Sequence, residues 1–199
     1  YKDELFWTEE GYRFSWRVML MEKAGYTQFT VFDAKTNRIV HVNNDGNKGL
    51  IYSLNYGISI SRSQYIARMD ADDICDKTRF EKQIREFEKN NQLVICGSLI
   101  KTFGDGKNFV SHMPITHEEI ISSILFICPF AHPSVMIRKD ALLKLDFIYR
   151  EDFKHSEDYD LWSRLVFTGN CKNIPEYLLK YRVHGAQASI LHKEQNHKN

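Results

Sequence analysis

The sequence is poor in features that would identify several protein classes directly. Its 199 residues include only four cysteines and four prolines, and no two cysteines stand in Cys-x-x-Cys spacing. A disulfide framework and a zinc site are therefore disfavoured, and such scattered cysteines fit a reducing compartment and small core positions. The four are Cys75, Cys96, Cys128 and Cys171.

An excess of charge of one sign and long apolar runs are absent as well. The formal net charge is +1, which gives no electrostatic footprint for nucleic acid. The longest apolar stretches, such as residues 120–130, are interrupted by serines and fall short of the roughly 20 residues that a membrane span requires. No secretory signal opens the chain. We expect a cytoplasmic protein with no membrane span and no nucleic-acid partner, and the start at Tyr1 suggests an incomplete or processed N-terminus.

The composition that is present describes one globular domain with a sizeable core, with 43% hydrophobic and 27% charged residues. From residue 38 onward, short β-like runs alternate with stretches of helical periodicity, which is typical of an α/β fold. Thr116 is a candidate helix cap. The predicted strands cover residues 38–42, 64–67, 93–100 and 134–137, and the predicted helices cover residues 50–61, 77–91 and 117–126.

Three carboxylates within four residues are the most distinctive chemical feature. Asp70, Asp72 and Asp73 follow the apolar run at residues 64–67, and carboxylates this close repel one another unless a cation lies among them. A strand that ends in Asp-x-Asp presents hard oxygen ligands for Mg²⁺ or Mn²⁺, and such ions bridge the phosphates of nucleotides. In the simpler alternative, Asp73 and Asp76 cap the following helix.

A second acidic group precedes an apolar helical face. Glu157 and Asp158 stand directly before Leu161, Trp162 and Leu165, which have helical spacing. Carboxylates at a helix N-terminus complement the helix dipole and cap free N–H groups, so this pattern alone does not indicate a functional site. The neighbouring motifs favour a functional interpretation.

Seven short motifs occur in a characteristic order and spacing. They are Asn47-Lys48-Gly49-Leu50, Ser53-Leu54-Asn55-Tyr56-Gly57-Ile58, Tyr65-Ile66-Ala67-Arg68-Met69-Asp70-Ala71-Asp72-Asp73, Arg79 with Gln83, His132-Pro133-Ser134, Glu157-Asp158-Tyr159-Asp160-Leu161-Trp162 and Tyr181-Arg182-Val183-His184. Together they resemble the bacterial family 2 glycosyltransferases of the GT-A fold.

This resemblance implies an α/β, Rossmann-like and mostly parallel sheet flanked by helices, without the first two strand–helix units that the family usually has. It implies inverting transfer of a sugar from a nucleotide-diphosphate sugar, a UDP-sugar foremost, to a glycan or lipid-linked acceptor in capsule or lipopolysaccharide synthesis. A divalent metal, Mn²⁺ or Mg²⁺, would assist the reaction. The protein would be cytoplasmic, with peripheral attachment to the inner membrane as an option.

On the donor side, the resemblance implies that Asp72, together with Asp70, holds the metal. His184 would approach the metal or the diphosphate, although a lone histidine in a polar stretch is more often a surface residue. Both aspartates would thus act on the leaving diphosphate.

Three arginines are further candidates for contact with the diphosphate by the same resemblance: Arg68, Arg79 and Arg182. For Arg68 and Arg79, pairing with the adjacent aspartates is an equal alternative.

On the acceptor side, the resemblance implies that Asp158 is the general base that removes the proton of the attacking hydroxyl, with Glu157 as the lesser candidate. His132 is a candidate for the acceptor pocket, and a turn at His132-Pro133 explains it almost as well. Trp162 is a candidate sugar platform, with core packing the favoured alternative.

The first 45 residues depart from the family. Residues 1–45 are similar to a segment of the vitamin K-dependent carboxylase-like membrane proteins, so we assign a foreign or diverged segment at 1–45, a partial GT-A domain at 46–190 and a polar tail at 191–199. If the segment is merely diverged, residues 12–22 form a helix, residues 28–33 a strand, and residues 38–42 a strand that enters the main sheet.

Three functions remain open at this point. The first is a metal-dependent glycosyltransferase or a fragment of one, and the second is a non-catalytic GT-A-like remnant that binds glycan or protein. The third is a metal-dependent phosphohydrolase or nucleotidyltransferase, which would also use clustered aspartates. We also expect the chain to lack a proper pocket for the nucleotide base, because the missing units would hold much of it.

Overall fold

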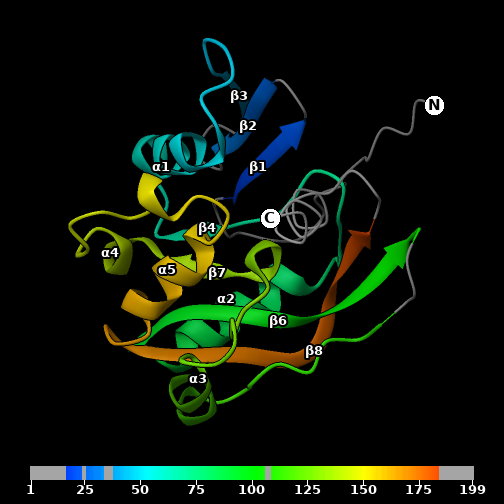
Figure 1. The fold of residues 1–199 in the computed structure, drawn as a ribbon, viewed down its shortest axis with the longest axis vertical. Helices are drawn as coiled ribbons and strands as arrows, with labels where there is room; N and C mark the ends of the chain where they lie inside the picture. The colour runs from blue at the N-terminus through cyan, green and yellow to red at the C-terminus, as the bar shows by residue number, and fades with distance from the viewer. Residues whose placement is uncertain (1–16, 24–25, 34–37, 106–108, 184–199) are drawn as a thin grey trace, which may run out of the picture.

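The computed structural model describes residues 17–23, 26–33, 38–105 and 109–183, which form two sheets with helices around the larger one (Figure 1). The smaller sheet is antiparallel and consists of β1 (Arg17–Lys23), β2 (Tyr26–Asp33) and β3 (Arg38–Asn43) in that order. Its β1 lies beside the edge strand β4 (Tyr65–Ala67) of the larger sheet.

The larger sheet has five strands in the order β4-β7-β6-β8-β5. Its other members are β5 (Ile74–Cys75), β6 (Leu93–Gly104), β7 (Met136–Arg138) and β8 (Asn170–Val183). The expected α/β, GT-A-like class is confirmed, but the sheet is mixed and not mostly parallel. Only β6 and β8 pair in parallel, because β7 enters between β4 and β6 antiparallel to both, and β5 runs antiparallel to β8.

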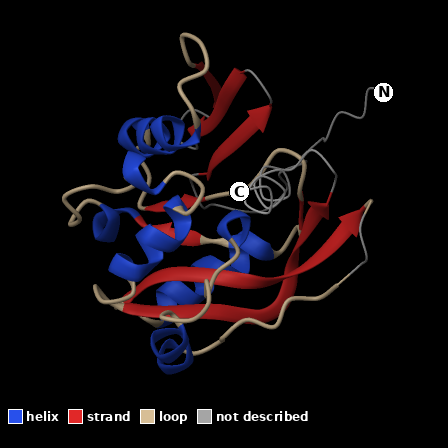
Figure 2. Cartoon of the chain, viewed as in Figure 1, coloured by secondary structure: helices blue, strands red, loops and turns tan. Residues whose placement is uncertain are grey.

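The helices, blue in Figure 2, include the three predicted at residues 50–61, 77–91 and 117–126, each somewhat shorter than expected. Thr116 caps its helix as expected, in a reciprocal capping box with Glu119. The helices are α1 (Leu50–Ile60), α2 (Arg79–Lys89), α3 (His117–Ser123), α4 (Lys139–Leu142) and α5 (Glu157–Leu165), and two short 3-10 turns cover His132–Ser134 and Glu151–Phe153.

Alternate residues of the central strands build two separate cores. Ile95 of β6 and Ile137 of β7 belong to the larger core, which is packed by α1, α3, α4 and α5. Cys96 and Met136, their neighbours in sequence, belong to the other core with Phe80 and Phe87 of α2. Because successive strand residues point to opposite faces, α2 covers one face of the sheet and the remaining helices cover the other.

A bulge in β8 directs the end of that strand. Ser98 pairs with Ile174 but Leu99 pairs with Tyr177, so the register shifts at Pro175. Proline cannot donate to a strand ladder and is tolerated at such irregularities. A bulge also bends its strand, and β8 continues beyond it to Arg182 beside the acidic segment.

The N-terminal expectations need two corrections. Residues 17–22 of the expected helix at 12–22 belong to β1, because antiparallel pairing with β2 supplies their backbone hydrogen bonds; residues 12–16 lie outside the described part. The strand at 38–42 exists as β3 but pairs with β2, and it does not enter the larger sheet. The strand expected at 28–33 is confirmed within β2, and the tail at 191–199 lies outside the described residues.

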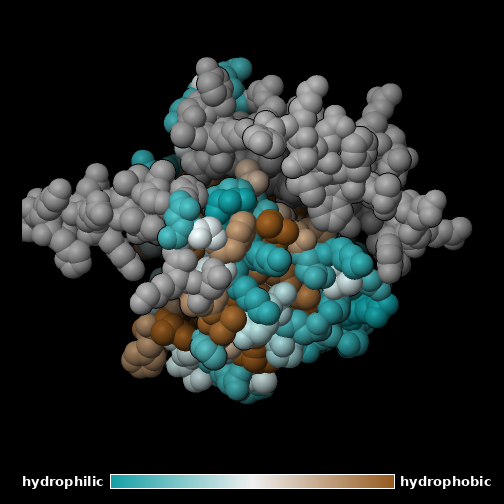
Figure 3. Space-filling view, turned by 90° about the vertical axis from the view of Figure 1, so that its right-hand side faces the viewer, coloured by the Kyte–Doolittle hydropathy of each residue, from teal (hydrophilic) through white to brown (hydrophobic). Residues whose placement is uncertain are grey.

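Other sequence expectations concern the cysteines and the surface. Cys96 and Cys171 are buried as small core residues, whereas Cys75 is partly exposed and Cys128 exposed. Within the described ranges, no helix has the length and apolar character needed to cross a bilayer. One face of the molecule shows its apolar residues as small brown patches among polar teal ones (Figure 3).

Candidate functional site

The acidic segment crosses the larger sheet from one edge to the other. It leaves β4 at Ala67 and reaches β5 at Ile74, and these two strands lie at opposite edges. On the way, Met69 packs against Ile100 of β6 and Leu179 of β8. The apolar contact holds the crossing down and places the aspartates around it at one end of the sheet.

Arg68 and Asp70 form a double charge-assisted hydrogen bond. The Nη1 and Nη2 atoms of Arg68 each lie 2.6 Å from a different carboxylate oxygen of Asp70. Arg68 is 6% exposed, and the Asp70 side chain is 27% exposed. The cation that close carboxylates require is thus supplied by the chain itself, and the pairing alternative for Arg68 is what the structure contains.

Arg182 of β8 contacts the same segment close to the edge strand β5. Its backbone N–H donates to Asp73 Oδ1 at 2.8 Å, and its Nε–H donates to the carbonyl of Asp72 at 2.8 Å. Asp73 therefore does not cap the next helix; Asp76 performs a related role, because its Oδ1 accepts from Thr78 N–H at 2.8 Å. The structure brings Arg182 to the acidic segment, as the candidate site requires.

Asp73 is buried, and its second oxygen, Oδ2, has no hydrogen-bond donor among the described residues. Burial raises the pKa of Asp73 to about 7, the Arg182 N–H opposes the rise, and Asp70 and Asp72 add to it. The Asp73 carboxyl group is therefore readily protonated near neutral pH.

Arg79 has a structural role that differs from the expected contact with the diphosphate. The residue is fully buried, and its Nη2 donates to the carbonyls of Arg68 at 2.8 Å and Val135 at 3.3 Å. Gln83 makes two further bonds of this kind, because its Nε2 donates to the carbonyls of Cys96 and Ser134. We call these buried side-chain bonds of Arg79 and Gln83 the clamp. A guanidinium enclosed in this way has no surface to offer a phosphate, so the expectation for Arg79 is wrong for this structure.

Asp158 and Glu157 open α5 as expected, with Glu157 buried and Asp158 partly exposed. Burial raises the pKa of Asp158, while the N–H of Tyr159 and the nearby charge of Arg68 oppose that rise. The positive charge of Arg68 thus acts on Asp158 as well as on Asp70, although the sequence separates these two acids by almost 90 residues.

His132 lies beneath the site and not in an open pocket. Its Nε2 is 2.9 Å from the hydroxyl of Tyr149, and both residues are buried. Burial lowers the pKa of His132 well below its usual value, and the positive charge of Arg68 adds to the effect. His132 is therefore neutral and supports the site from inside, which corrects its expected place on the acceptor surface.

Trp162 is a core residue. It is fully buried and packs edge-on against the rings of Phe130 and His132, with ring centres 5.7 Å apart in both pairs. The favoured alternative of core packing is thus found, and Trp162 has no surface for a sugar. His184, the third expected metal ligand, lies outside the described residues.

Two residues that support the site, Tyr149 and Asp160, were not predicted from the sequence. Tyr149 stands in a segment without periodicity, so nothing in the sequence marks it. Asp160 is buried and pairs with Arg150 and Arg164, which makes it the structural acid of the Glu157–Asp160 group. Its place on the apolar side of the helix, one residue before Leu161, was the available signal.

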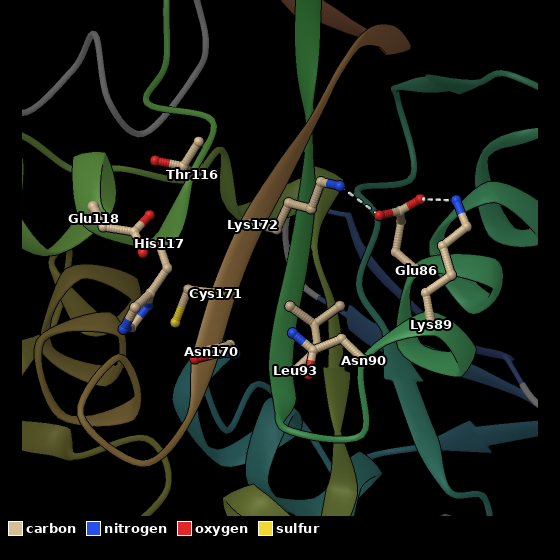
Figure 4. Close-up of a pocket in the computed structure, with 10 residues that line it drawn as sticks. All are labelled: Glu86, Lys89, Asn90, Leu93, Thr116, His117, Glu118, Asn170, Cys171 and Lys172. Atoms are coloured by element: carbon tan, nitrogen blue, oxygen red, sulfur yellow. Dashed lines mark hydrogen bonds and ion pairs between the residues drawn. The ribbon is translucent and has the colours of Figure 1, made fainter.

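A cavity of about 420 Å³ lies elsewhere, between the starts of β6, β8 and α3 and the end of α2. Figure 4 shows Lys89 and Lys172 both directed at Glu86, which neutralises much of the charge of that pocket. Ile100, beneath the acidic segment, lies seven positions along β6 from Leu93 at this cavity, which is about 23 Å of strand. The cavity is thus separate from the carboxylate site.

Comparison with known proteins decides the family. The sequence model described as Glycosyl transferase family 2 matches residues 26–146 of this chain, which include the acidic segment, Arg79 and His132. This chain belongs to glycosyltransferase family 2. A second model, described as vitamin K-dependent gamma-carboxylase, lumenal domain, matches residues 1–50. Both matches share residues 26–50, so the family 2 match begins earlier than residue 47, where the motifs of the resemblance start.

Two bacterial relatives of this family 2 glycosyltransferase show the extent of the similarity. An uncharacterized glycosyltransferase of Haemophilus influenzae is 33% identical over 170 residues, covering 80% of this chain and 53% of the relative. The O-antigen biosynthesis glycosyltransferase WbnJ of Escherichia coli is 37% identical over 141 residues, covering 68% of this chain and 54% of the relative. The chain therefore spans about half the length of the curated relatives it matches.

The fold of this family 2 glycosyltransferase is similar to that of a solved structure from the same class. Residues 1–349 of S. aureus TarS, in complex with UDP-GlcNAc, superpose with a TM-score of 0.56 at 13% identity. The match covers 70% of this chain and 40% of the TarS chain. At this identity the likeness establishes the GT-A fold alone.

Proposed function

We propose that this chain carries the reacting part of a glycosyltransferase that moves a sugar from a nucleotide-diphosphate sugar to a glycan or lipid-linked acceptor. The observation that carries the proposal is the position of Arg68, which is bonded to Asp70 and close enough to Asp158 to affect its pKa. Transfer needs a charged site for the leaving diphosphate and a carboxylate for the attacking hydroxyl. Both kinds of group converge here.

A UDP-sugar is the proposed donor. TarS, whose fold is similar, has been solved with UDP and with UDP-GlcNAc, and this supports the proposal for the present chain. Arg182 and Asp72, which are hydrogen-bonded neighbours, would face the diphosphate together. In this arrangement the chain binds mainly the diphosphate end of the donor, so the identity of the base should matter little.

The described residues can supply only some of the ligands that a divalent metal ion, Mn²⁺ or Mg²⁺, would need. The described residues contain no cluster of three or more histidine, cysteine or acidic side chains suited to hold an ion alone. Both oxygens of Asp70 are engaged by Arg68, and Asp72 is partly exposed and carries hard carboxylate oxygens. Mg²⁺ commonly binds to one or two carboxylates together with substrate phosphates. Asp72 would therefore hold the ion, and the ion would supply charge stabilisation for the leaving diphosphate.

Asp158 is the proposed general base, with Glu157 beside it. Its pKa is raised by burial, which brings the carboxylate closer to the proton affinity that base catalysis needs. Direct attack by the activated hydroxyl inverts the anomeric centre and needs no covalent enzyme intermediate. A role in surface polysaccharide synthesis, in the cytoplasm at the inner membrane, is proposed from the named function of WbnJ.

Calorimetry of nucleotide binding tests the donor half. UDP, GDP and UDP-GlcNAc would be titrated into the full chain with and without Mn²⁺. We expect Mn²⁺-dependent binding, similar for UDP and GDP, that weakens at least about tenfold in Asp72→Asn. Asp140→Asn, an exposed acid on α4, is the matched control and should bind as the parent does. Binding that ignores both Mn²⁺ and Asp72→Asn would refute the proposal.

A further inference from the structure

The cavity of about 420 Å³ extends around the end of the larger sheet at which β6 and β8 begin. Its walls come from both faces of that sheet. Cys171 of β8 belongs to the core that α3 and α5 pack, whereas the next residue, Lys172, is bonded to Glu86 of α2 on the opposite face. The acidic segment lies farther along β6, over Ile100. Small-molecule sites commonly have volumes of roughly 300–1,000 Å³, so the cavity has room for a small ligand of its own.

One wall of the cavity is an ion network that is held in place. Nζ of Lys89 lies 2.7 Å from Oε1 of Glu86, and Nζ of Lys172 bonds to Oε2 of the same carboxylate (Figure 4). Burial acts to raise the pKa of Glu86, but the two ammonium groups outweigh it and lower the pKa below its usual value. Glu86 therefore stays ionised, with both oxygens engaged. A lysine ammonium has three N–H donors, and each of these two uses one on Glu86, so this wall offers further donors to a ligand.

The other wall carries polar groups that no described residue engages. The Nδ1 atom of His117 is buried and has no hydrogen-bond partner in the described part of the chain. The side chains of Glu118 and Asn170 also line the cavity and have no partner among the described residues. A buried polar atom without a partner is costly and rare in folded proteins. An imidazole and an amide can each donate and accept, so this wall suits a ligand that does both.

The formal charges that line the cavity cancel. Lys89 and Lys172 stand against Glu86 and Glu118, so neither an anion nor a cation finds an uncompensated charge. A neutral ligand rich in hydroxyl groups fits this lining, because every hydroxyl both donates and accepts. We propose that the cavity binds a neutral saccharide of one or two rings, at a site apart from the acidic segment. The inference goes beyond the proposed function and does not depend on sugar transfer.

Nitrogen-15 NMR of the labelled full chain locates the binding. Maltose, cellobiose and N,N′-diacetylchitobiose would each be titrated to about 20 mM, a range that detects millimolar affinity. We expect at least one of them to shift the amide signals of residues 116–118 and 170–172 in a saturable way and to leave those of residues 70–73 unchanged. Asn170→Ala should weaken this binding at least about fivefold, because the hydrogen bonds of the amide are lost. Asn91→Ala, which removes an exposed amide beside the cavity that does not line it, is the matched control and should bind as the parent does.

Two further variants keep the test decisive if Asn170→Ala does not fold. His117→Phe keeps a ring but loses both nitrogens, and Glu118→Ala changes an exposed side chain without a partner among the described residues. Each should weaken the saccharide at least about threefold. The inference is overturned if none of the three sugars shifts the cavity signals in a saturable way, if all folded variants bind as the parent does, or if inorganic phosphate binds there more tightly than the sugars. A chain that binds a saccharide at the cavity but releases no UDP would contradict only the proposed function.

Discussion

The side-chain amide of Asn55 binds both backbone polar groups of Tyr149. Its Nδ2 donates to the Tyr149 carbonyl at 2.8 Å, and its Oδ1 accepts from the Tyr149 N–H at 3.0 Å. One residue of α1 thereby fixes a segment 94 positions away, and Tyr149 in turn holds His132. The site therefore depends on a helix that contributes no reacting group.

Replacing Asn55 by alanine should destabilise the protein by about 2 kcal/mol. The reason is that both backbone groups of Tyr149 lose their partner in a partly buried place, and each unmet group costs about 1 kcal/mol or more. Urea unfolding followed by circular dichroism measures the change. Ser59→Ala on the same helix removes only an exposed local bond to Tyr56 and should cost less than about 0.5 kcal/mol. Equal effects of the two substitutions would show that the Asn55 contact contributes nothing special.

Replacing Gln83 by leucine should cost about 2–4 kcal/mol. The leucine keeps the volume but leaves the carbonyls of Cys96 and Ser134 without a donor, in a fully buried position. Arg85→Ala on the same helix removes an exposed pair with Glu81 and should change stability by less than about 1 kcal/mol. Thermal and urea unfolding of the two variants provide the comparison, and a Gln83→Leu protein as stable as the parent would show that the clamp is dispensable.

Stability should fall in acid partly because of His132. Its pKa is lowered in the folded protein, so the unfolded chain binds a proton below about pH 6.5 that the folded protein does not. The contribution of His132 is complete above that pH and is lost as the pH falls, by up to about 1.4 kcal/mol per unit. The His132→Gln variant should therefore lose less stability than the parent between pH 6.5 and 5, as measured by urea unfolding at each pH.

The titration of Asp73 changes the stability of the protein in the opposite direction over part of this pH range. Its folded pKa of about 7 lies above the unfolded value, so its contribution is complete at low pH and is lost as the pH rises towards 7. Asp73→Asn serves as the control with the reverse sign: removing Asp73 should steepen the acid loss of stability, whereas removing His132 should flatten it. Parallel pH profiles for the parent and the His132→Gln variant would contradict the buried, neutral histidine.

The sequence predicts local elements better than it predicts the contacts between them. Apolar residues at helical spacing located α1 and α2 to within two residues, and Thr116 with Glu119 marked the start of α3. The helix expected over residues 12–22 failed for its last part because pairing between β1 and β2 decides that segment, and local periodicity does not contain the pairing. Likewise β7 reads as a strand, but its antiparallel insertion between β4 and β6 depends on the whole sheet.

The same limit applies to the site. The acidic segment, Asp158 and Arg182 could be found from motifs, since their spacing is local or the resemblance supplies it. Burial of Arg79 and Trp162 depends on which face of each helix meets the sheet, and the bond from Asn55 to Tyr149 joins positions 94 residues apart. Tertiary packing fixes these features, so they required the structure.

Acceptor-dependent release of UDP from UDP-GlcNAc in the presence of Mn²⁺ tests the central claim most directly. The full chain would be supplied with a panel of simple glycosides, alongside Asp158→Asn and the Asp140→Asn control. We predict release that needs a glycoside, falls at least about 100-fold in Asp158→Asn and is unchanged in the control, while the Asp158→Asn protein still binds UDP. Release that Asp158→Asn leaves intact, or nucleotide binding without any acceptor-dependent release by the parent chain, would contradict the account.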